Sequence, residues 1–275
     1  MAGSQAAVVG VGPMGLWMAQ HLAKKGYSVK VYDINSAKTR MAAKRFTAAK
    51  SLDDAVSNAS IAVVAVGSKN AGKTIRQILT RHHGKTIIDI SSVKTPVIQP
   101  LRRTSPYSGL IVLTHPLFGP GAKKLEDKTV VVTPFRRPAE ETVIARKIFS
   151  PCKIVSMSPD MHDRVMAYAM AVPRVLMLAL LECWRRKKID VLTTSQKALM
   201  LAASTILTEK PQVINEIVTQ NPYTAEAVAD IQNLIKNIRQ KTSANILQTY
   251  RKLATQTTDL AKQYSRAYSI IEKVA

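Results

Sequence analysis

The sequence of 275 residues is poor in cysteine, aromatic and acidic side chains. Its 2 cysteines, Cys152 and Cys183, are too few for a disulfide framework and lack metal-ligand spacing, which favours a reducing cytoplasm. No group of His, Asp or Glu residues has metal-ligand spacing either, so we expect no bound metal. The first residues lead almost directly into an apolar run, which argues against a signal peptide.

The shortage of acidic residues leaves a strongly basic chain. Against 40 Lys and Arg residues stand 18 Asp and Glu residues, and the formal net charge is +22. Such an excess raises the question of nucleic-acid binding. The basic residues are scattered, however, aromatic residues make up only 5% of the chain, and no known nucleic-acid motif is present. We therefore expect a basic surface that attracts small anionic ligands, and no nucleic-acid partner.

The sequence also lacks an uninterrupted apolar stretch that would predict a membrane span. Its one long apolar stretch, from Val165 to Leu181, carries Pro173 and Arg174 in its middle. A charge at the centre of a membrane-spanning helix is costly. This stretch therefore predicts a buried core helix, and we expect no membrane partner.

A glycine-rich turn stands between an apolar run at 6–9 and a helical pattern at 16–25. This arrangement is the dinucleotide-binding fingerprint in its required context. Gly10 allows the tight turn, Gly12 lets the backbone approach a pyrophosphate, and Gly15 lets the helix pack close to the strand. The phosphates would lie at the helix N-terminus, whose N–H groups and dipole favour anions.

An acid, Asp33, ends the second apolar run and would accept hydrogen bonds from the adenosine ribose. Its charge would repel a 2′-phosphate, so we expect NAD rather than NADP, although Lys38 and Arg40 lie close enough to weaken this preference. The residues predicted to contact the dinucleotide are Gly10, Gly12, Pro13, Met14, Gly15, Asp33, Ile34, Val66, Gly67, Ser91 and Ser92.

Strand and helix patterns alternate from the N-terminus to about residue 157, which predicts a Rossmann-type, doubly wound, mostly parallel sheet. Long helical patterns replace them afterwards, with breaks near Pro211 and Pro222. We predict a dinucleotide-binding domain over residues 1–157 and an all-helical substrate and dimerisation domain over residues 158–275. The apolar helices of the second region predict a homodimer.

Ligands of such sheets bind outside the carboxyl ends of the strands. Strand patterns end near Val66, near Asp89 and near Thr114, and His115 follows the last of them in a loop rich in proline and glycine. This position makes His115 the best candidate for a general base. A structural histidine remains the alternative.

Two further features lie in the second region. His162 and Asp163 stand near the start of its first helix, where Asp160 could form the cap, and capping and packing are favoured over catalysis. Arg174 stands in an apolar helix, where an unpaired charge would be expensive. It is predicted to bind either a substrate carboxylate or an internal acid such as Glu182.

Four segments together resemble the prephenate/arogenate dehydrogenase family. They are the glycine-rich fingerprint with Asp33, the segment DISSVK at 89–94, the segment HPLFGP at 115–120 and the segment HDRVMA at 162–167. The resemblance covers roughly residues 5–180. It implies a nucleotide domain followed by a helical dimerisation domain, and NAD-dependent oxidative decarboxylation of prephenate to 4-hydroxyphenylpyruvate in tyrosine biosynthesis.

The same resemblance assigns roles to residues of this chain. It implies that His115 takes the proton of the ring hydroxyl and that Ser92 contacts that hydroxyl or His115 and the nicotinamide ribose. Where many relatives have histidines, this chain has Ala171 and Arg174. Arg174 is therefore the candidate for binding a substrate carboxylate, with Arg239 as a possible helper.

Other interpretations of the sequence remain open. Arogenate carries an ammonium group that an acid such as Glu226 could bind. A β-hydroxyacid dehydrogenase would need a lysine in the first long helix of its second domain, and the chain from Met161 to Leu181 has none. A third possibility is a protein without catalysis that senses a dinucleotide or binds nucleic acid.

Overall fold

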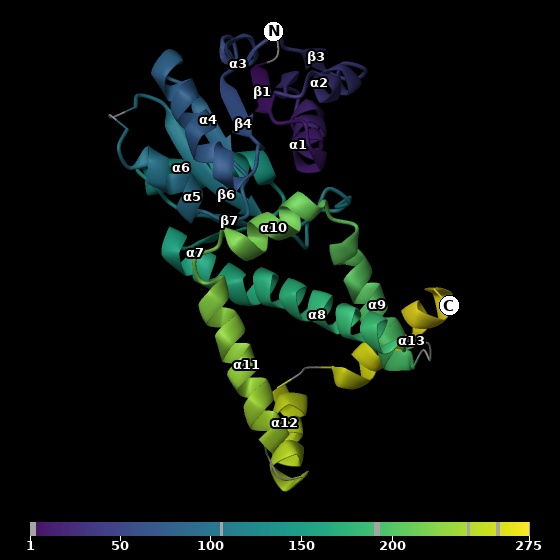
Figure 1. Cartoon of the computed structure of the whole chain (residues 1–275). Coiled ribbons are helices and arrows are strands. Elements are labelled where there is room, and N and C mark those ends of the chain that lie inside the picture. The colour runs from purple at the N-terminus through teal and green to yellow at the C-terminus, as the bar shows by residue number, and fades with distance from the viewer. Residues whose placement is uncertain (1–3, 105–106, 190–192, 241–242, 257–258, 275) are drawn as a thin grey trace. The chain divides into compact units, whose positions relative to one another are not determined.

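A computed structural model describes residues 4–104, 107–189, 193–240, 243–256 and 259–274 (Figure 1). The chain divides into two compact units, Met1–Met166 with Gln220–Pro222 and Ala167–Thr219 with Tyr223–Ala275. The sequence placed the boundary at 157/158, at the beginning of the helix Pro159–Met166 (α7) rather than at its end. That helix belongs with the first unit because its Asp163 is bonded to Lys94 and Thr95.

The first unit is built on a single eight-stranded sheet with the order β3-β2-β1-β4-β5-β6-β7-β8. All neighbouring pairs are parallel except β6 and β7, which run antiparallel. The strands are β1 (Gln5–Val9), β2 (Ser28–Tyr32), β3 (Thr47–Ala48), β4 (Ile61–Val64), β5 (Thr86–Asp89), β6 (Leu110–Pro116), β7 (Thr129–Val132) and β8 (Lys153–Ser156). The predicted mostly parallel sheet is confirmed.

Helices cover both faces of this sheet (Figure 1). Residues of α1 (Pro13–Lys24), α2 (Ser36–Ala42) and α6 (Pro138–Phe149) pack in one core, and residues of α3 (Leu52–Val56), α4 (Ser68–Arg81) and α5 (Thr95–Leu101) pack in the other. Alternate residues of β1 point into opposite cores: Ala6 and Val8 into the first, Ala7 and Val9 into the second. Strands buried on both faces read as continuous apolar runs, and this is why the sequence revealed them.

Helix α5 was not predicted from the sequence. It contains Pro96 and Pro100, and prolines are poor residues for a helix interior. The carboxylate of Asp163 accepts hydrogen bonds from the backbone N–H groups of Lys94 and Thr95 at 2.8 and 2.7 Å, so a distant side chain stabilises the helix start. This contact has no signature in the local sequence.

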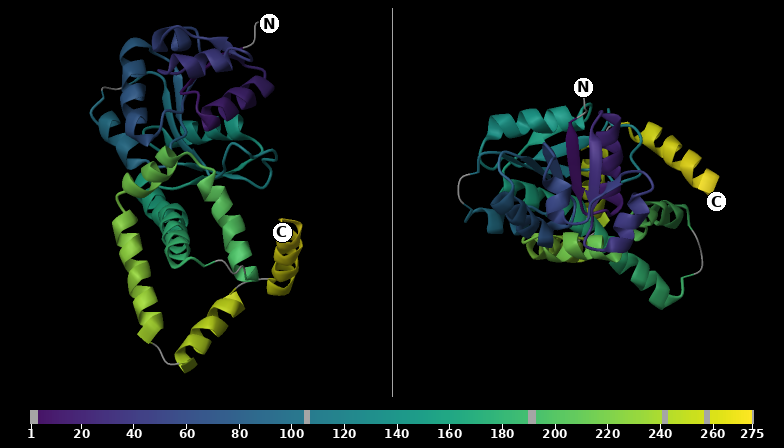
Figure 2. Two further views of the ribbon diagram at one scale, coloured as in Figure 1. Left: turned by 45° about the vertical axis from the view of Figure 1, so that its right-hand side comes forward. Right: turned by 90° about the horizontal axis from the view of Figure 1, so that it is seen from above.

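The second unit is helical. It begins with a π-helical turn, η1 (Ala167–Ala171), that continues directly into α8 (Val172–Lys187). Its further helices are α9 (Thr194–Leu207), α10 (Pro211–Thr219), α11 (Thr224–Gln240), α12 (Ser243–Gln256) and α13 (Leu260–Val274). Helices α10 and α11 pack against η1 and α8, and α13 packs against α9 (Figures 1 and 2).

The core of the second unit is small. Buried residues cluster at Ala167, Val172 and Ala227, with Tyr223, Val228 and Ile231 packed around them. Large apolar side chains of α8, such as Leu176 and Leu178, are exposed. The prediction of a buried core helix over 165–181 is therefore wrong for the single chain, because too few helices surround it to cover its apolar sides.

The continuous helical stretch Pro159–Lys187 is long and apolar enough to cross a membrane, by length and composition alone, and 28% of its most apolar window is buried. A soluble core or interface helix passes the same test. The stretch holds the π-turn and the charged Arg174, which is itself buried and paired inside the helical unit. These features are those of a helix that packs against protein.

Candidate active site

The glycine-rich turn joins β1 to α1 in the way that the sequence predicted. Gly10 has φ +95°, a conformation that favours glycine, and its N–H donates to the carbonyl of Tyr32 at 2.7 Å. A Cβ at Gly10 would lie 2.4 Å from the carbonyl oxygen of Ala65, and one at Gly15 would lie 1.9 Å from that of Gly10. Both positions therefore require glycine for the fold itself.

Gly12 differs from the other two glycines, because a Cβ added there would meet nothing within 4 Å. The open space lies at the N-cap of α1, where no side chain forms a capping hydrogen bond within the described chain. Backbone N–H groups at a helix start and an adjacent open space suit a phosphate group. The turn therefore fits a dinucleotide pyrophosphate.

Asp33 follows β2 beside this turn and is buried. Its carboxylate accepts hydrogen bonds from the N–H groups of Val11 and Asn35, each at 2.8 Å, while the ammonium of Lys38 lies 3.8 Å away. Each carboxylate oxygen has a second acceptor position, which can serve ribose hydroxyls. The neighbouring Ile34 is 94% exposed, so it offers an apolar surface beside Asp33.

The other predicted cofactor residues also lie at the carboxyl edge of the sheet. Gly67, with φ +84°, follows β4 and Val66 and caps α4. Ser91 follows β5 and donates from its hydroxyl to Asp89 at 2.5 Å, whereas Ser92 is half-buried beside it. Since β1, β2, β4, β5 and β6 are all parallel, these residues and His115 share one edge of the first unit.

A buried ion pair connects the ends of β5 and β6. Lys94 and Asp89 are both 0% exposed, and the Lys94 Nζ donates to Asp89 Oδ2 at 2.5 Å and to the carbonyl of Thr114 at 2.6 Å. The Thr114 hydroxyl donates back to the carbonyl of Asp89 at 2.7 Å. Thr114 directly precedes His115, so this network fixes the backbone that carries the candidate base. Lys94 had no predicted role, although a lysine shortly after a strand-ending aspartate is a visible signal in the sequence.

His115 begins a chain of buried polar side chains. Its Nδ1 lies 2.9 Å from His162 Nε2, and His162 Nδ1 lies 2.8 Å from Asp163 Oδ1. All three residues are buried, His115 at 3% exposure. Asp163 also accepts hydrogen bonds from the N–H groups of Lys94 and Thr95 and from the Thr95 hydroxyl. The sequence favoured capping and packing over catalysis here; Asp163 binds the first N–H groups of α5, and its connection to His115 through His162 was missed. Ser158, not Asp160, caps its own helix, accepting from the Met161 N–H at 3.2 Å.

The protonation of this chain follows from its surroundings. Burial lowers the pKa of His162 and outweighs the opposite effect of its hydrogen bond to Asp163, so the imidazole is neutral at physiological pH. Burial alone would raise the pKa of Asp163, but the hydrogen bonds from His162, Lys94 and Thr95 together hold it below its ordinary value. The Asp163 carboxylate therefore accepts a hydrogen bond from His162 Nδ1–H, and His162 Nε2 can accept one from His115 Nδ1–H. A neutral His115 then carries its lone pair on Nε2, the nitrogen that a general base needs.

The two arginines expected to bind substrate lie in the second unit. Arg174 is 9% exposed, and its guanidinium holds both carboxylate oxygens of Glu209, at 3.1 and 2.5 Å, and the carbonyl of Met170 at 3.0 Å. The internal acid suggested by the sequence, Glu182, instead pairs with Arg185 and Arg186. A guanidinium edge that holds Glu209 in this bidentate way cannot at the same time hold a substrate carboxylate.

Arg239 is exposed near the end of α11. The start of that helix packs near α8 through Ala227 and Val172, and Arg239 lies about 18 Å further along the helix axis. Within one chain, the structure therefore does not bring Arg239 and Arg174 together, and the role of Arg239 stays a prediction.

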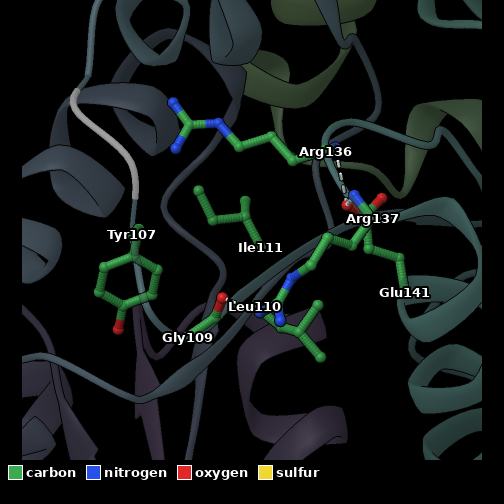
Figure 3. Close-up of a pocket in the computed structure, with 7 residues that line it drawn as sticks. All are labelled: Tyr107, Gly109, Leu110, Ile111, Arg136, Arg137 and Glu141. Atoms are coloured by element: carbon green, nitrogen blue, oxygen red, sulfur yellow. Dashed lines mark hydrogen bonds between the residues drawn. The ribbon is translucent and has the colours of Figure 1, made fainter.

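A small pocket of about 130 Å³ lies at the opposite edge of the sheet from His115, where β6 begins (Figure 3). It is lined by Tyr107, Gly109, Leu110, Ile111, Arg136, Arg137 and Glu141. The Glu141 carboxylate accepts the N–H groups of Phe135, Arg136 and Arg137, and the Arg136 guanidinium bonds the backbone of Thr104. These groups hold the loop after β7 and are not part of the candidate active site. Within the described residues, no group of His, Cys, Asp and Glu side chains could hold a metal ion.

The family model that matches the chain is the NAD binding domain of 6-phosphogluconate dehydrogenase, over residues 5–134. A curated relative, the probable arogenate/prephenate dehydrogenase of Methanocaldococcus jannaschii, is 24% identical over 239 residues, which cover 84% of this chain and 52% of the relative. The chain thus spans about half the length of the curated relative that it matches.

Two solved enzymes share the fold along nearly their whole length. Prephenate dehydrogenase from Aquifex aeolicus has a TM-score of 0.73 at 16% identity, covering 91% of this chain and 98% of its own. Synechocystis arogenate dehydrogenase has a TM-score of 0.72 at 18% identity, covering 94% and 99%. The Aquifex enzyme was also solved in complex with hydroxyphenyl propionate and NAD+. The chain thus matches an NAD-binding domain over residues 5–134, is similar to a probable arogenate/prephenate dehydrogenase and shares the fold of solved prephenate and arogenate dehydrogenases.

Proposed function

We propose that the chain catalyses the NAD-dependent oxidative decarboxylation of prephenate to 4-hydroxyphenylpyruvate, a reaction of tyrosine biosynthesis. The observation that supports this most strongly is the buried chain from His115 through His162 to Asp163, at the sheet edge that also carries the glycine-rich turn. The oxidation of an alcohol needs a base that removes the hydroxyl proton. The hydrogen bond between His115 and His162 fixes the tautomer of His115 in which Nε2 can do this.

His115 acts as the general base in this proposal. Its Nε2 removes the proton of the ring hydroxyl, and the positive charge that develops on the imidazole is stabilised through His162 by the Asp163 carboxylate. Ser92, at the adjacent strand end, orients the same hydroxyl. Loss of carbon dioxide from the ring carboxylate then makes the ring aromatic, which drives the reaction forward.

The dinucleotide-binding residues supply the other half of the site. When bound, NAD supplies a nicotinamide that accepts a hydride from the carbon bearing the hydroxyl. Gly12, Met14 and Gly15 would hold the pyrophosphate through backbone N–H groups, and Asp33 would hold the adenosine ribose. Pro13 lacks an N–H group and fixes the first residue of α1. Ile34 would cover the adenine, and Val66, Gly67 and Ser91 would border the nicotinamide half.

Arogenate is the second candidate substrate. A fold neighbour at a TM-score of 0.72 is an arogenate dehydrogenase, and Glu226 in the first turn of α11 offers this chain an acid for an ammonium group. The two substrates differ only in the side chain, so the base and the cofactor would act identically on both.

The partners proposed for this function are the small substrate and a second copy of the chain, in the cytoplasm. The exposed apolar residues of the helical unit support a homodimer. Neither a membrane nor a nucleic acid is required by the proposed reaction.

Steady-state rates with prephenate and arogenate, each with NAD and NADP, test the proposal. We expect the highest kcat/KM with NAD, and one carbon dioxide released for each NADH formed. An alcohol oxidation without carbon dioxide would instead indicate a β-hydroxyacid dehydrogenase. Absence of turnover with both substrates, together with DNA binding that weakens steeply with salt, would favour the class without catalysis.

A further inference from the structure

The loop between β6 and β7, residues 117–128, follows His115; its Phe118 and Leu125 pack against the core of the first unit, but few hydrogen bonds hold it. Gly119 and Gly121 have no atoms within 4 Å of an added Cβ, and Lys123 and Lys124 are exposed. Among the described residues, one hydrogen bond ties residues 118–127 to another element: the indole N–H of Trp17 donates to the carbonyl of Ala122 at 3.2 Å. In Figure 2 the loop extends beneath α1, which carries Trp17.

Trp17 also contacts the loop through its ring. The edge of one ring meets the face of the other between Trp17 and Phe118, with centroids 5.0 Å apart and planes at 63°. This geometry is favourable for aromatic pairs. Phe118 is the third residue after His115, so this contact fixes the chain where it leaves the candidate base.

Trp17 is held in place by two further aromatic rings on the side away from the loop, those of His21 and Phe149. Its ring stacks on His21 at 5.0 Å, and His21 stacks on Phe149 of α6 at 6.4 Å. Burial lowers the pKa of His21, so a neutral imidazole donates from Nε2 to the carbonyl of Ile148 at 2.7 Å. The column from Phe149 to Phe118 therefore gives Trp17 a fixed position on α1.

Trp17 lies on the same helix as the glycine-rich turn. The glycine-rich turn is at the N-terminus of the same helix, about one turn before Trp17. A helix turn is rigid, so whatever orders the helix start also orders Trp17. We propose that Trp17 is a positioning residue that couples the dinucleotide-binding turn to the loop after His115, keeping the base aligned when the cofactor site is filled. This inference rests on the proposed function.

The matched substitutions Trp17→Phe and Trp184→Phe test the coupling, because the chain has 2 tryptophans and Trp184 lies on α8 in the other unit. Trp17→Phe keeps an aromatic ring but loses the N–H that bonds Ala122. The first readout is the rate of tryptic cleavage after Lys123 and Lys124 without cofactor. We expect Trp17→Phe to accelerate it about 3–10-fold, the loss of one hydrogen bond, and Trp184→Phe to leave it unchanged.

The second readout separates kcat from cofactor binding. With the better of the two substrates, Trp17→Phe should lower kcat about 3–10-fold while the Kd for NAD+ changes less than about twofold. Phe118→Leu, which alters the loop side of the contact and leaves α1 intact, should reproduce both effects. Unchanged cleavage in both variants, or a kcat loss matched by an equal loss of NAD+ affinity, would overturn the inference.

The proposed function and this inference fail in different ways. If the unmodified protein turns over neither substrate, the proposed function is overturned, and cleavage with NAD+ present decides the inference alone. Coupling predicts that NAD+ slows cleavage after Lys123 and Lys124 in the unmodified protein and slows it much less in Trp17→Phe. Equal slowing in both proteins would refute the coupling.

Discussion

The two units of this chain differ in which groups they bury. The first encloses charged and polar side chains, including Lys94, Asp89 and Asp163, and each has bonded partners. The second has a small core and exposes leucine, isoleucine and tyrosine side chains along α11, α12 and α13. Buried charges are tolerated only where they are paired. A large apolar surface that is exposed on a single chain marks a site where another molecule binds. The first unit therefore pairs the charges that it buries, whereas the exposed apolar side chains of the second support the proposed homodimer.

The largest effect is expected in the polar network of the first unit. Replacing His115 by Asn should lower kcat about 10²–10⁴-fold, because a general base is lost, with little change in NAD+ affinity. A rate equal to that of the unmodified protein would remove His115 from the mechanism. Because burial lowers the pKa of His162, protonation of that residue should contribute to the loss of activity only below the ordinary pKa of histidine. A pH profile of kcat provides this measurement.

Cofactor choice tests the other half of the first unit. We expect kcat/KM to favour NAD over NADP by about 10²-fold, since placing a 2′-phosphate beside the Asp33 carboxylate would cost several kcal/mol. The ammonium of Lys38, 3.8 Å from that carboxylate, reduces the preference, so Lys38→Gln should increase it further. A preference for NADP would contradict the assignment of Asp33.

The apolar surface of the second unit is tested by its assembly. We expect a homodimer at micromolar concentration and a monomer after Leu253→Lys, a change on the exposed side of α12. Sedimentation velocity distinguishes the two. Met41→Lys, on an exposed apolar residue of the first unit, is the matched control and should leave the dimer intact. A monomeric unmodified protein would show that the exposed apolar residues have another purpose.

The smallest effect is expected for the ion pair between Arg174 and Glu209 in the second unit. Arg174→Gln should lower the stability by about 1–3 kcal/mol, because it leaves the partly buried Glu209 without its partner. The KM for prephenate should change little. The control Arg185→Gln breaks an exposed pair with Glu182 and should hardly alter the melting temperature. A raised KM with unchanged stability would restore Arg174 as a substrate-binding residue.

The sequence predicted the first unit well because its signals are local. The glycine-rich turn, the acid after β2 and the continuous apolar strands each occupy a few adjacent residues, and the structure forms them where they were expected. His115 was identified by its place near a strand end alone; the sequence put it in the loop after the strand, whereas the structure includes it in the last residues of β6, paired with Val131 of β7. The cofactor and substrate roles of these residues stay predictions.

What the sequence did not reveal depends on contacts between distant residues. The link between His115 and His162 joins positions 47 residues apart, and the pairing of Arg174 with Glu209 spans 35. The start of α5 depends on Asp163, which is 68 residues from Thr95. No periodicity or motif reports such pairs, so one sequence could give the candidates but not their partners.

The three glycines of the cofactor turn differ in what would select for them. Gly10 and Gly15 are closed to any side chain by backbone atoms, whereas Gly12 faces open space. A library of variants screened only for folding should therefore retain glycine at positions 10 and 15 while accepting alanine or serine at position 12. Glycine at position 12 should be recovered only when the same library is screened for dinucleotide affinity. Within six residues, the turn thus contains two glycines that are needed for a stable fold and one that is needed only for binding the ligand.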